Sequence, residues 1–185
     1  CRDRCSYCDF YSTKYHEPAV DPYLGFLQME LKRRAAGYEF DTVFFGGGTP
    51  TSIGAESLRR FLDWFAANLR LAPGVEWTVE ANPGTVTPEK ARLLKTAGVT
   101  RVSMGAQSFD PGILKAMKRI HSADDLVPDL DLAALVMEPG NGPQSDEPGM
   151  HVRFLTNRSA DMAMLRAFAG ALRVAIESMQ YSGGQ

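Results

Sequence analysis

The stretch VEWTVEANPGTVTPEKARLLKTAGVTRVSMGA, residues 75–106, contains a strand, a helix and a second strand in succession. Residues 75–81 and 100–106 are short apolar runs bounded by turn-forming residues, which predicts two strands. Between them, Thr87 followed by proline is a helix start signal, and Gly98 is a stop signal. Because a helix connects the two strands, we expect them to lie parallel in one sheet with a right-handed crossover.

The same alternation of strands and helices extends outward over about residues 21–120. Upstream, Asp21 followed by proline predicts the N-cap and first turn of a helix that Gly37 ends, and residues 41–46 predict a strand. A second helix is predicted by an apolar stripe formed by Leu58, Phe61, Leu62, Phe65 and Leu69. Downstream, Asp110 followed by proline predicts the start of another helix. The predicted fold class is α/β with a parallel sheet, whose functional groups should gather at the carboxyl ends of the strands.

The composition is that of an ordinary globular domain and argues against nucleic acid as a partner. The 185 residues are 44% hydrophobic and 23% charged, and the formal net charge is -2 with the basic residues scattered along the chain. The basic run Lys32, Arg33 and Arg34 is interpreted as the solvated face of a helix. No apolar stretch approaches the ~18 residues of a membrane span. We therefore expect no transmembrane segment and a location in the reducing cytoplasm.

All three cysteines of the chain, Cys1, Cys5 and Cys8, lie in the run CRDRCSYCDF at CxxxCxxC spacing. Thiolates gathered in one short loop are typical ligands of iron-sulfur clusters and of zinc. With three cysteines, a [4Fe-4S] cluster would keep one iron open, which is typical of a catalytic or substrate-binding metal. Zinc held by the three thiolates and His16 is the alternative. Disulfide pairing is disfavoured because an odd count strands one thiol.

Glycine and polar residues follow three successive predicted strands. Glycines at 46–48, followed by Thr49, end the first strand and would let a ligand approach the backbone. Glu80 ends the next strand, and Gln107 ends the one after it. Singly, these residues are equally well explained as a glycine turn, a solvated carboxylate and a turn cap. Together, at the sheet edge where the cysteine loop is expected, they predict a ligand-binding site.

Five motifs in register resemble one known family. The motifs CRDRCSYCDF, FGGGTPT, EANPGT, RVSMGAQSFD and KRIHS look like the radical S-adenosylmethionine (SAM) proteins of the oxygen-independent coproporphyrinogen III oxidase family, which includes the bacterial haem chaperone. The resemblance covers about residues 1–125. It implies that Cys1, Cys5 and Cys8 hold a [4Fe-4S] cluster, whose open iron takes the amino and carboxylate groups of SAM.

The resemblance also implies which residues contact SAM and what chemistry follows. The implied cofactor-binding residues are Tyr7, Gly47, Gly48, Thr49, Glu80, Gln107 and Arg119. Of these, the glycines and the threonine match the motif that receives the methionine end of SAM. In the family, the reduced cluster gives one electron to the SAM sulfonium, and the resulting 5'-deoxyadenosyl radical abstracts hydrogen. The protein orients the cofactors and excludes water and oxygen.

Phe10 favours the haem chaperone branch of this family, because the decarboxylating oxidase has a further cysteine at that position. A chaperone would bind haem or porphyrin and deliver haem to an acceptor protein, and an electron donor would serve the cluster. His16, His121 and His151 are candidate haem ligands by their chemistry, although each is more often a surface or packing histidine. The alternatives are an enzyme of the coproporphyrinogen III oxidase type and a metal-binding fragment without further function. No catalytic residue is assigned.

The resemblance ends near residue 125, and the rest of the chain is predicted to differ from the family. Residues 126–150 form a Pro/Gly-rich linker in this prediction, and residues 151–185 form a short strand and an amphipathic helix of unknown role. The expected fold is a partial radical SAM (β/α) barrel over residues 1–125, truncated at both ends. It would lack the strand before Cys1 and most of the distal half.

Overall fold

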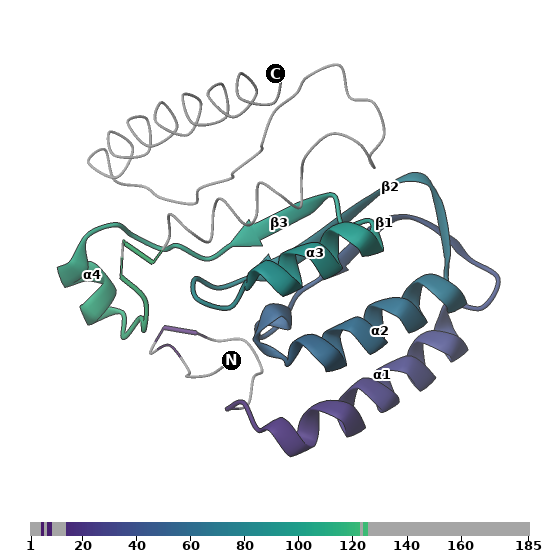
Figure 1. Cartoon of the computed structure of the whole chain (residues 1–185), viewed down its shortest axis with the longest axis horizontal. Helices are drawn as coiled ribbons and strands as arrows, with labels where there is room; N and C mark the ends of the chain where they lie inside the picture. The colour runs from purple at the N-terminus through teal and green to yellow at the C-terminus, as the bar shows by residue number, and fades with distance from the viewer. Residues whose placement is uncertain (1–4, 6, 9–13, 123, 126–185) are drawn as a thin grey trace, which may run out of the picture.

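Three parallel strands form one sheet in the computed structural model (Figure 1). The structure describes residues 5, 7–8, 14–122 and 124–125. The strands are β1 (Glu39–Phe45), β2 (Arg70–Ala81) and β3 (Arg101–Met104), and they lie side by side in the order β1-β2-β3. Both neighbouring pairs run parallel, with Val79 of β2 opposite Val102 of β3. The predicted parallel α/β sheet is confirmed.

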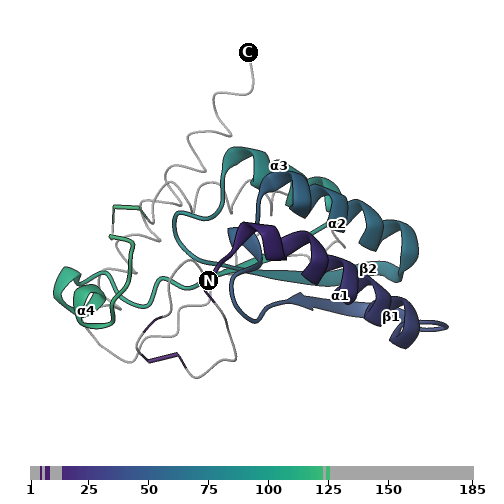
Figure 2. The ribbon, with the colours of Figure 1, turned by 90° about the horizontal axis from the view of Figure 1, so that it is seen from below.

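Three helices cover one face of the sheet, and the second and third of them connect successive strands (Figure 2). The three helices are α1 (Val20–Arg34), α2 (Ala55–Asn68) and α3 (Pro88–Ala97), and a short helix, α4 (Pro111–Ala116), follows β3. Two single turns of 3-10 helix, η1 (Glu17–Ala19) and η2 (Pro50–Ser52), precede α1 and α2. None of the helices in the described part of the chain has the length and apolar character needed to cross a membrane.

The hydrophobic core lies between the sheet and the helices. Four residues of the predicted α2 stripe, Leu58, Phe61, Leu62 and Phe65, are buried, whereas Leu69 follows the end of the helix and is only partly buried. An aromatic cluster joins this helix to the sheet: the ring of Phe65 lies 5.0 Å from that of Phe45 and 4.9 Å from that of Trp77, between centroids. Contacts of this kind stabilise a core beyond the burial of apolar area. Helix α2 therefore packs against both β1 and β2.

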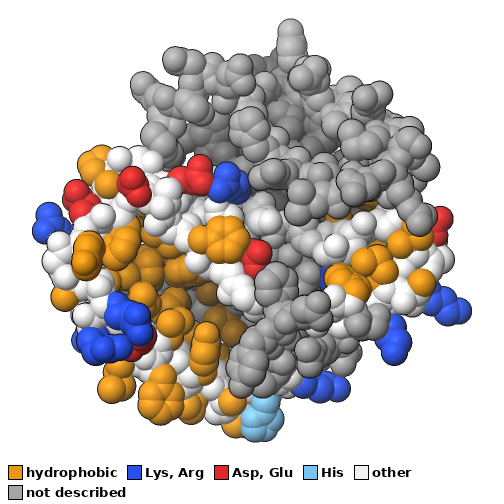
Figure 3. Space-filling model, turned by 180° about the vertical axis from the view of Figure 1, so that it is seen from behind, with side chains coloured by type: hydrophobic (Ala, Val, Ile, Leu, Met, Phe, Trp, Pro, Cys, Tyr) orange, Lys and Arg blue, Asp and Glu red, His pale blue; other side chains and the backbone are white. Residues whose placement is uncertain are grey.

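The opposite face of the sheet carries exposed side chains. Phe44 on this face is 63% exposed. On the helical side, Tyr23, Phe26 and Met29 of α1 are also exposed. Figure 3 shows hydrophobic side chains gathered over part of the molecule when it is viewed from behind. The described helices thus cover one side of the sheet and leave apolar surface on the other.

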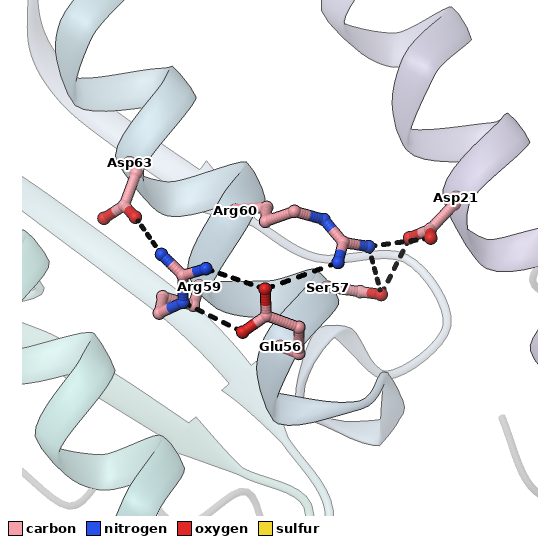
Figure 4. Close-up of polar contacts among 6 residues, drawn as sticks. All are labelled: Asp21, Glu56, Ser57, Arg59, Arg60 and Asp63. Carbon is pink, nitrogen blue, oxygen red and sulfur yellow. Dashed lines mark hydrogen bonds and ion pairs between the residues drawn. The ribbon is translucent and has the colours of Figure 1, made fainter.

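The prediction that Asp21 caps α1 is wrong. The turn η1 begins at Glu17, contains Pro18 and leads directly into α1, so the helix starts at Val20 and its N-cap is Ala19. Asp21 instead accepts hydrogen bonds from Ser57 Oγ and from the Arg60 guanidinium, each over 2.7 Å (Figure 4). The hydrogen bond from Ser57, aided by Arg60, lowers the pKa of Asp21 below its usual value. Asp21 therefore links α1 to α2.

The strands also differ in length from the predictions. Strand β2 begins at Arg70, well before the predicted start at residue 75, because Arg70 and Leu71 pair with the start of β1 ahead of an irregularity in the register. Strand β3 ends at Met104, two residues before the predicted end. Residues 126–185 lie outside the described residues, so the proposed linker and tail stay predictions.

Candidate functional site

The carboxyl ends of β1, β2 and β3 meet at one edge of the sheet, as expected for parallel strands. The glycine loop at 46–48 follows β1, Glu80 lies one residue before the end of β2, and Gln107 lies three residues after β3. Helix α4 lies beyond this same edge of the sheet (Figure 1). The sheet therefore brings these three predicted positions to the same edge.

The glycine loop is in direct contact with Glu80. The Gly47 amide donates a hydrogen bond to Glu80 Oε2 over 3.1 Å, and Gly47 has a φ of +107°. A Cβ atom at Gly46 would lie 2.8 Å from the same carboxylate oxygen and 2.5 Å from the ring of Phe44. Gly46 thus permits the close approach of Glu80 to the loop. Gly48 follows in the exposed part of the loop.

Asn82, which is not among the predicted site residues, joins two of them. Its Nδ2 donates to Thr49 Oγ1 over 2.6 Å, and its Oδ1 accepts a hydrogen bond from Arg119 Nη2 over 2.9 Å. The motif Asn82-Pro83-Gly84 is typical of a turn, and a turn alone accounts for an asparagine at this position. The sequence therefore offered no reason to assign the side chain to the site. Both ends of the amide are therefore engaged within the site.

Arg119 points from the segment after α4 toward the strand ends. Its Nη2 also donates to the Gly105 carbonyl over 2.7 Å, and its Nη1 donates to Cys5 Sγ over 3.2 Å. Its Nε is buried and has no hydrogen-bond partner among the described residues. A buried donor without a partner is rare in folded proteins and calls for an explanation, such as a ligand.

Gln107 lies beside Asn82 and Arg119 at the end of β3. A Cβ atom built on Gly105 would lie 2.9 Å from Asn82 Oδ1, 3.0 Å from Gln107 Nε2 and 3.7 Å from Arg119 Nη2. The three polar side chains thus converge on Gly105. Gln107 itself has a φ of +68°, which residues other than glycine seldom adopt.

The cysteine loop approaches the same group of side chains. The Cys8 amide donates to the Cys5 carbonyl over 3.2 Å, which closes a tight turn containing Tyr7. Partial burial raises the pKa of Tyr7, and the neighbouring Cys5 thiol raises it further, while Arg119 opposes this shift. Cys1 and Phe10 lie outside the described residues. Within the described ranges no three His, Cys, Asp or Glu side chains gather as a metal site, and Cys5 and Cys8 do not form a disulfide bond with each other.

A buried lysine ties two of the site's loops together. Lys90 on α3 donates from Nζ to the Thr51 carbonyl over 2.7 Å and to the Thr85 carbonyl over 3.2 Å, and it is 6% exposed. The Thr51 and Thr85 hydroxyls are 2.6 Å apart and bond to one another. The loop after β1 and the turn after β2 are therefore fastened to each other. Sequence reasoning missed this lysine, because a lysine on an amphipathic helix is normally exposed.

Two of the three histidines lie in the described part of the chain. His121 is 7% exposed, and its Nε2 donates to the Ala106 carbonyl over 3.0 Å. Burial lowers its pKa, and the charge of Arg119 acts in the same direction. This environment favours the packing interpretation of His121 over that of a haem ligand. His16 is exposed, and His151 lies outside the described residues.

The sequence matches a known family over most of its length. The profile of the Radical SAM superfamily matches residues 1–134. The heme chaperone HemW of Bacillus subtilis (strain 168) is 37% identical over 130 residues, which are 68% of this chain and 34% of that protein. The heme chaperone HemW of Escherichia coli (strain K12) is 40% identical over 129 residues, with the same two coverages. The chain thus spans about a third of the length of these relatives.

The fold is also similar to a solved structure. Coproporphyrinogen III oxidase from Escherichia coli, a radical SAM enzyme, superposes with a TM-score of 0.67 at 25% sequence identity. The similarity covers 72% of this chain and 32% of that chain. The three-stranded sheet and its helices therefore correspond to part of a larger radical SAM fold.

Proposed function

The chain belongs to the radical SAM superfamily, and on this premise we propose that it binds a [4Fe-4S] cluster and SAM as part of a haem chaperone-like protein. Membership of the family implies the cluster and SAM. Haem binding, an acceptor protein for the haem and an electron donor for the cluster are the further parts of the proposal. Its expected location is the reducing cytoplasm, where thiol ligands are maintained.

The observation that carries the proposal is the convergence of Cys5, Arg119, Asn82 and Thr49 in one chain of hydrogen bonds. The described residues fit the two cofactors. Cys5 and Cys8 supply soft sulfur ligands, and the spacing adds Cys1 as the third. The guanidinium of Arg119 is positively charged, and its buried Nε has no hydrogen-bond partner among the described residues. It therefore suits an anionic ligand group such as the SAM carboxylate.

The remaining residues would hold and orient SAM. Glu80 fixes the glycine loop through the Gly47 amide, and Gly47, Gly48 and Thr49 would receive the methionine end. Gln107 offers an amide at the end of β3, and Tyr7 an aromatic ring beside Cys5. When bound, the cluster and SAM supply one-electron radical chemistry. The surrounding side chains would hold these groups in place and keep water away.

Three observations bear on the candidate functions of the whole protein. The names of the relatives and Phe10, which stands where the oxidase has a further cysteine, support the haem chaperone. The structural similarity to coproporphyrinogen III oxidase supports an enzyme of that type as the second candidate.

Haem titration and a turnover assay test the choice between them. The full chain is reconstituted anaerobically with iron and sulfide, titrated with haem by absorption, and incubated with SAM, a reductant and coproporphyrinogen. We expect saturable haem binding and no decarboxylated product. SAM-dependent formation of product would overturn the chaperone in favour of the oxidase. Failure to bind haem would contradict the chaperone directly.

A further inference from the structure

We propose that Asn82 is a positioning residue for SAM, which sets the relative positions of Thr49 and Arg119 through the two ends of its side-chain amide. The inference rests on the proposed function of the same site. Thr49 belongs to the loop after β1 and Arg119 to the segment after α4, so Asn82 bridges two parts of the chain that lie far apart in sequence.

The chemistry of the amide makes this bridge directional. Nδ2 is a donor and faces the Thr49 hydroxyl at 2.6 Å, whereas Oδ1 is an acceptor and faces the Arg119 guanidinium at 2.9 Å. A rotated amide would place its donor against the guanidinium, which has only donors to offer. One orientation therefore satisfies both neighbours, and it fixes Thr49 and Arg119 at the same time.

Asn82 is itself held in place by buried groups. The backbone carbonyl of Asn82 accepts a hydrogen bond from the Thr85 hydroxyl over 2.5 Å, and the backbone N–H of Asn82 donates to the same hydroxyl oxygen over 3.3 Å. Lys90 donates to the Thr85 carbonyl and to the carbonyl of Thr51, which lies in the loop after β1. Hydrogen bonds shielded from water are costly to break, because they leave unpaired polar groups behind. The network from Lys90 to Asn82 thus gives the bridge a rigid base.

The test compares two substitutions at this position with a matched control. Asn82→Leu keeps a similar volume and removes both hydrogen bonds. Asn82→Asp keeps an acceptor for Arg119, and the Thr49 hydroxyl can turn to donate to it. Asn68→Leu is the control, since Asn68 is exposed and its side chain donates to the Trp64 carbonyl near the end of α2.

SAM affinity of the reconstituted full chain is the first measurement. Neither hydrogen bond is made to SAM, so the affinity falls because Thr49 and Arg119 are no longer held in place. At about tenfold for each bond at most, Asn82→Leu should weaken binding by up to about 100-fold and Asn82→Asp by less than tenfold. Iron content should stay at the wild-type level in every variant. Equal affinities for wild type and Asn82→Leu would overturn the inference, because a residue that positions Thr49 and Arg119 cannot be replaced by leucine without weakening SAM binding.

Deuterium uptake of the chain without cofactors is the second measurement. Asn82→Leu should speed exchange in the peptide covering residues 46–52, and Asn68→Leu should leave it unchanged. Unaltered uptake in Asn82→Leu would also overturn the inference. A wild-type chain that carries a cluster but does not bind SAM would overturn the proposed function itself, so the two failures are distinguishable.

Discussion

At the scale of single residues, the site contains a backbone conformation that costs stability. Gln107 has a φ of +68°, and a residue other than glycine in this region carries a strain of about 1–3 kcal/mol. Such strain persists where the surroundings fix the residue, and it is common at ligand sites. The adjacent convergence of Asn82 and Arg119 on Gly105 supplies those surroundings.

Replacing Gln107 by glycine should separate stability from binding. Gln107→Gly relieves the strain and should raise the free energy of unfolding by about 1 kcal/mol, while removing the side-chain amide should weaken SAM binding about tenfold. Chemical denaturation and SAM titration measure the two effects. Gln28→Gly in the interior of α1 is the matched control, and it should lower the free energy of unfolding by about 1 kcal/mol. A destabilised Gln107→Gly variant would contradict the strain argument.

His121 should make stability depend on pH. Its folded-state pKa is lowered, chiefly by burial, from an ordinary value of 6.5, so below that value the unfolded chain binds a proton that the folded chain resists. The resulting stability is present above pH 6.5 and is lost as the pH falls through the folded-state pKa. His121→Gln keeps a donor for the Ala106 carbonyl and removes the titration.

Denaturation curves between pH 7 and about pH 5 measure this dependence. The fall in unfolding free energy over this range should be smaller for His121→Gln than for wild type. His16→Gln, which changes an exposed ring, serves as the control. An identical fall in wild type and His121→Gln would show that His121 does not contribute.

At the scale of elements, α3 and α4 end in the same way with different residues. After α3, Gly98 has a φ of +91°, and the amides of Gly98 and Val99 donate to the Lys95 and Leu94 carbonyls. After α4, Lys118 has a φ of +53°, and the next amide, that of Arg119, donates to the Leu114 carbonyl over 2.9 Å. Both are left-handed helix ends that favour glycine. The end of α4 therefore directs Arg119 toward the strand ends at a conformational cost.

Exchanging the residue types at these two ends should change stability in opposite directions. Lys118→Gly should raise the free energy of unfolding by about 1 kcal/mol, and Gly98→Lys should lower it by about 1 kcal/mol. A Cβ atom at Gly98 meets no atom within 4 Å, so that cost is conformational. Thermal and chemical denaturation of both variants provide the comparison. A destabilised Lys118→Gly variant would refute this account of the α4 end.

Local signals in the sequence predicted the elements well, and contacts between distant residues explain what they missed. Thr87 and Gly98 bound α3 as predicted, because a cap and a left-handed glycine act within one turn of the helix. Asp21 was assigned wrongly because an aspartate suited to capping is equally suited to bonding a neighbouring helix. Asn82 and Lys90 escaped notice because their partners, Thr49 and Thr51, are 33 and 39 residues away.

At the scale of the whole molecule, one edge of the sheet brings together segments that lie far apart in the sequence. The cysteine loop, the ends of all three strands and the segment after α4 meet there, while the core lies between the helices and the sheet. The chain spans about a third of its haem chaperone relatives, and this third includes the motifs proposed to bind the cluster and SAM. Haem handling depends on the whole protein and stays a proposal.

Electron paramagnetic resonance of the reduced, reconstituted chain, recorded with and without SAM, tests the central claim most directly. The account predicts a [4Fe-4S] signal that changes when SAM is added, and that is lost when Cys5 or Cys8 is replaced by serine. A cluster signal that SAM leaves unchanged, or tight binding of zinc in place of a cluster, would contradict it.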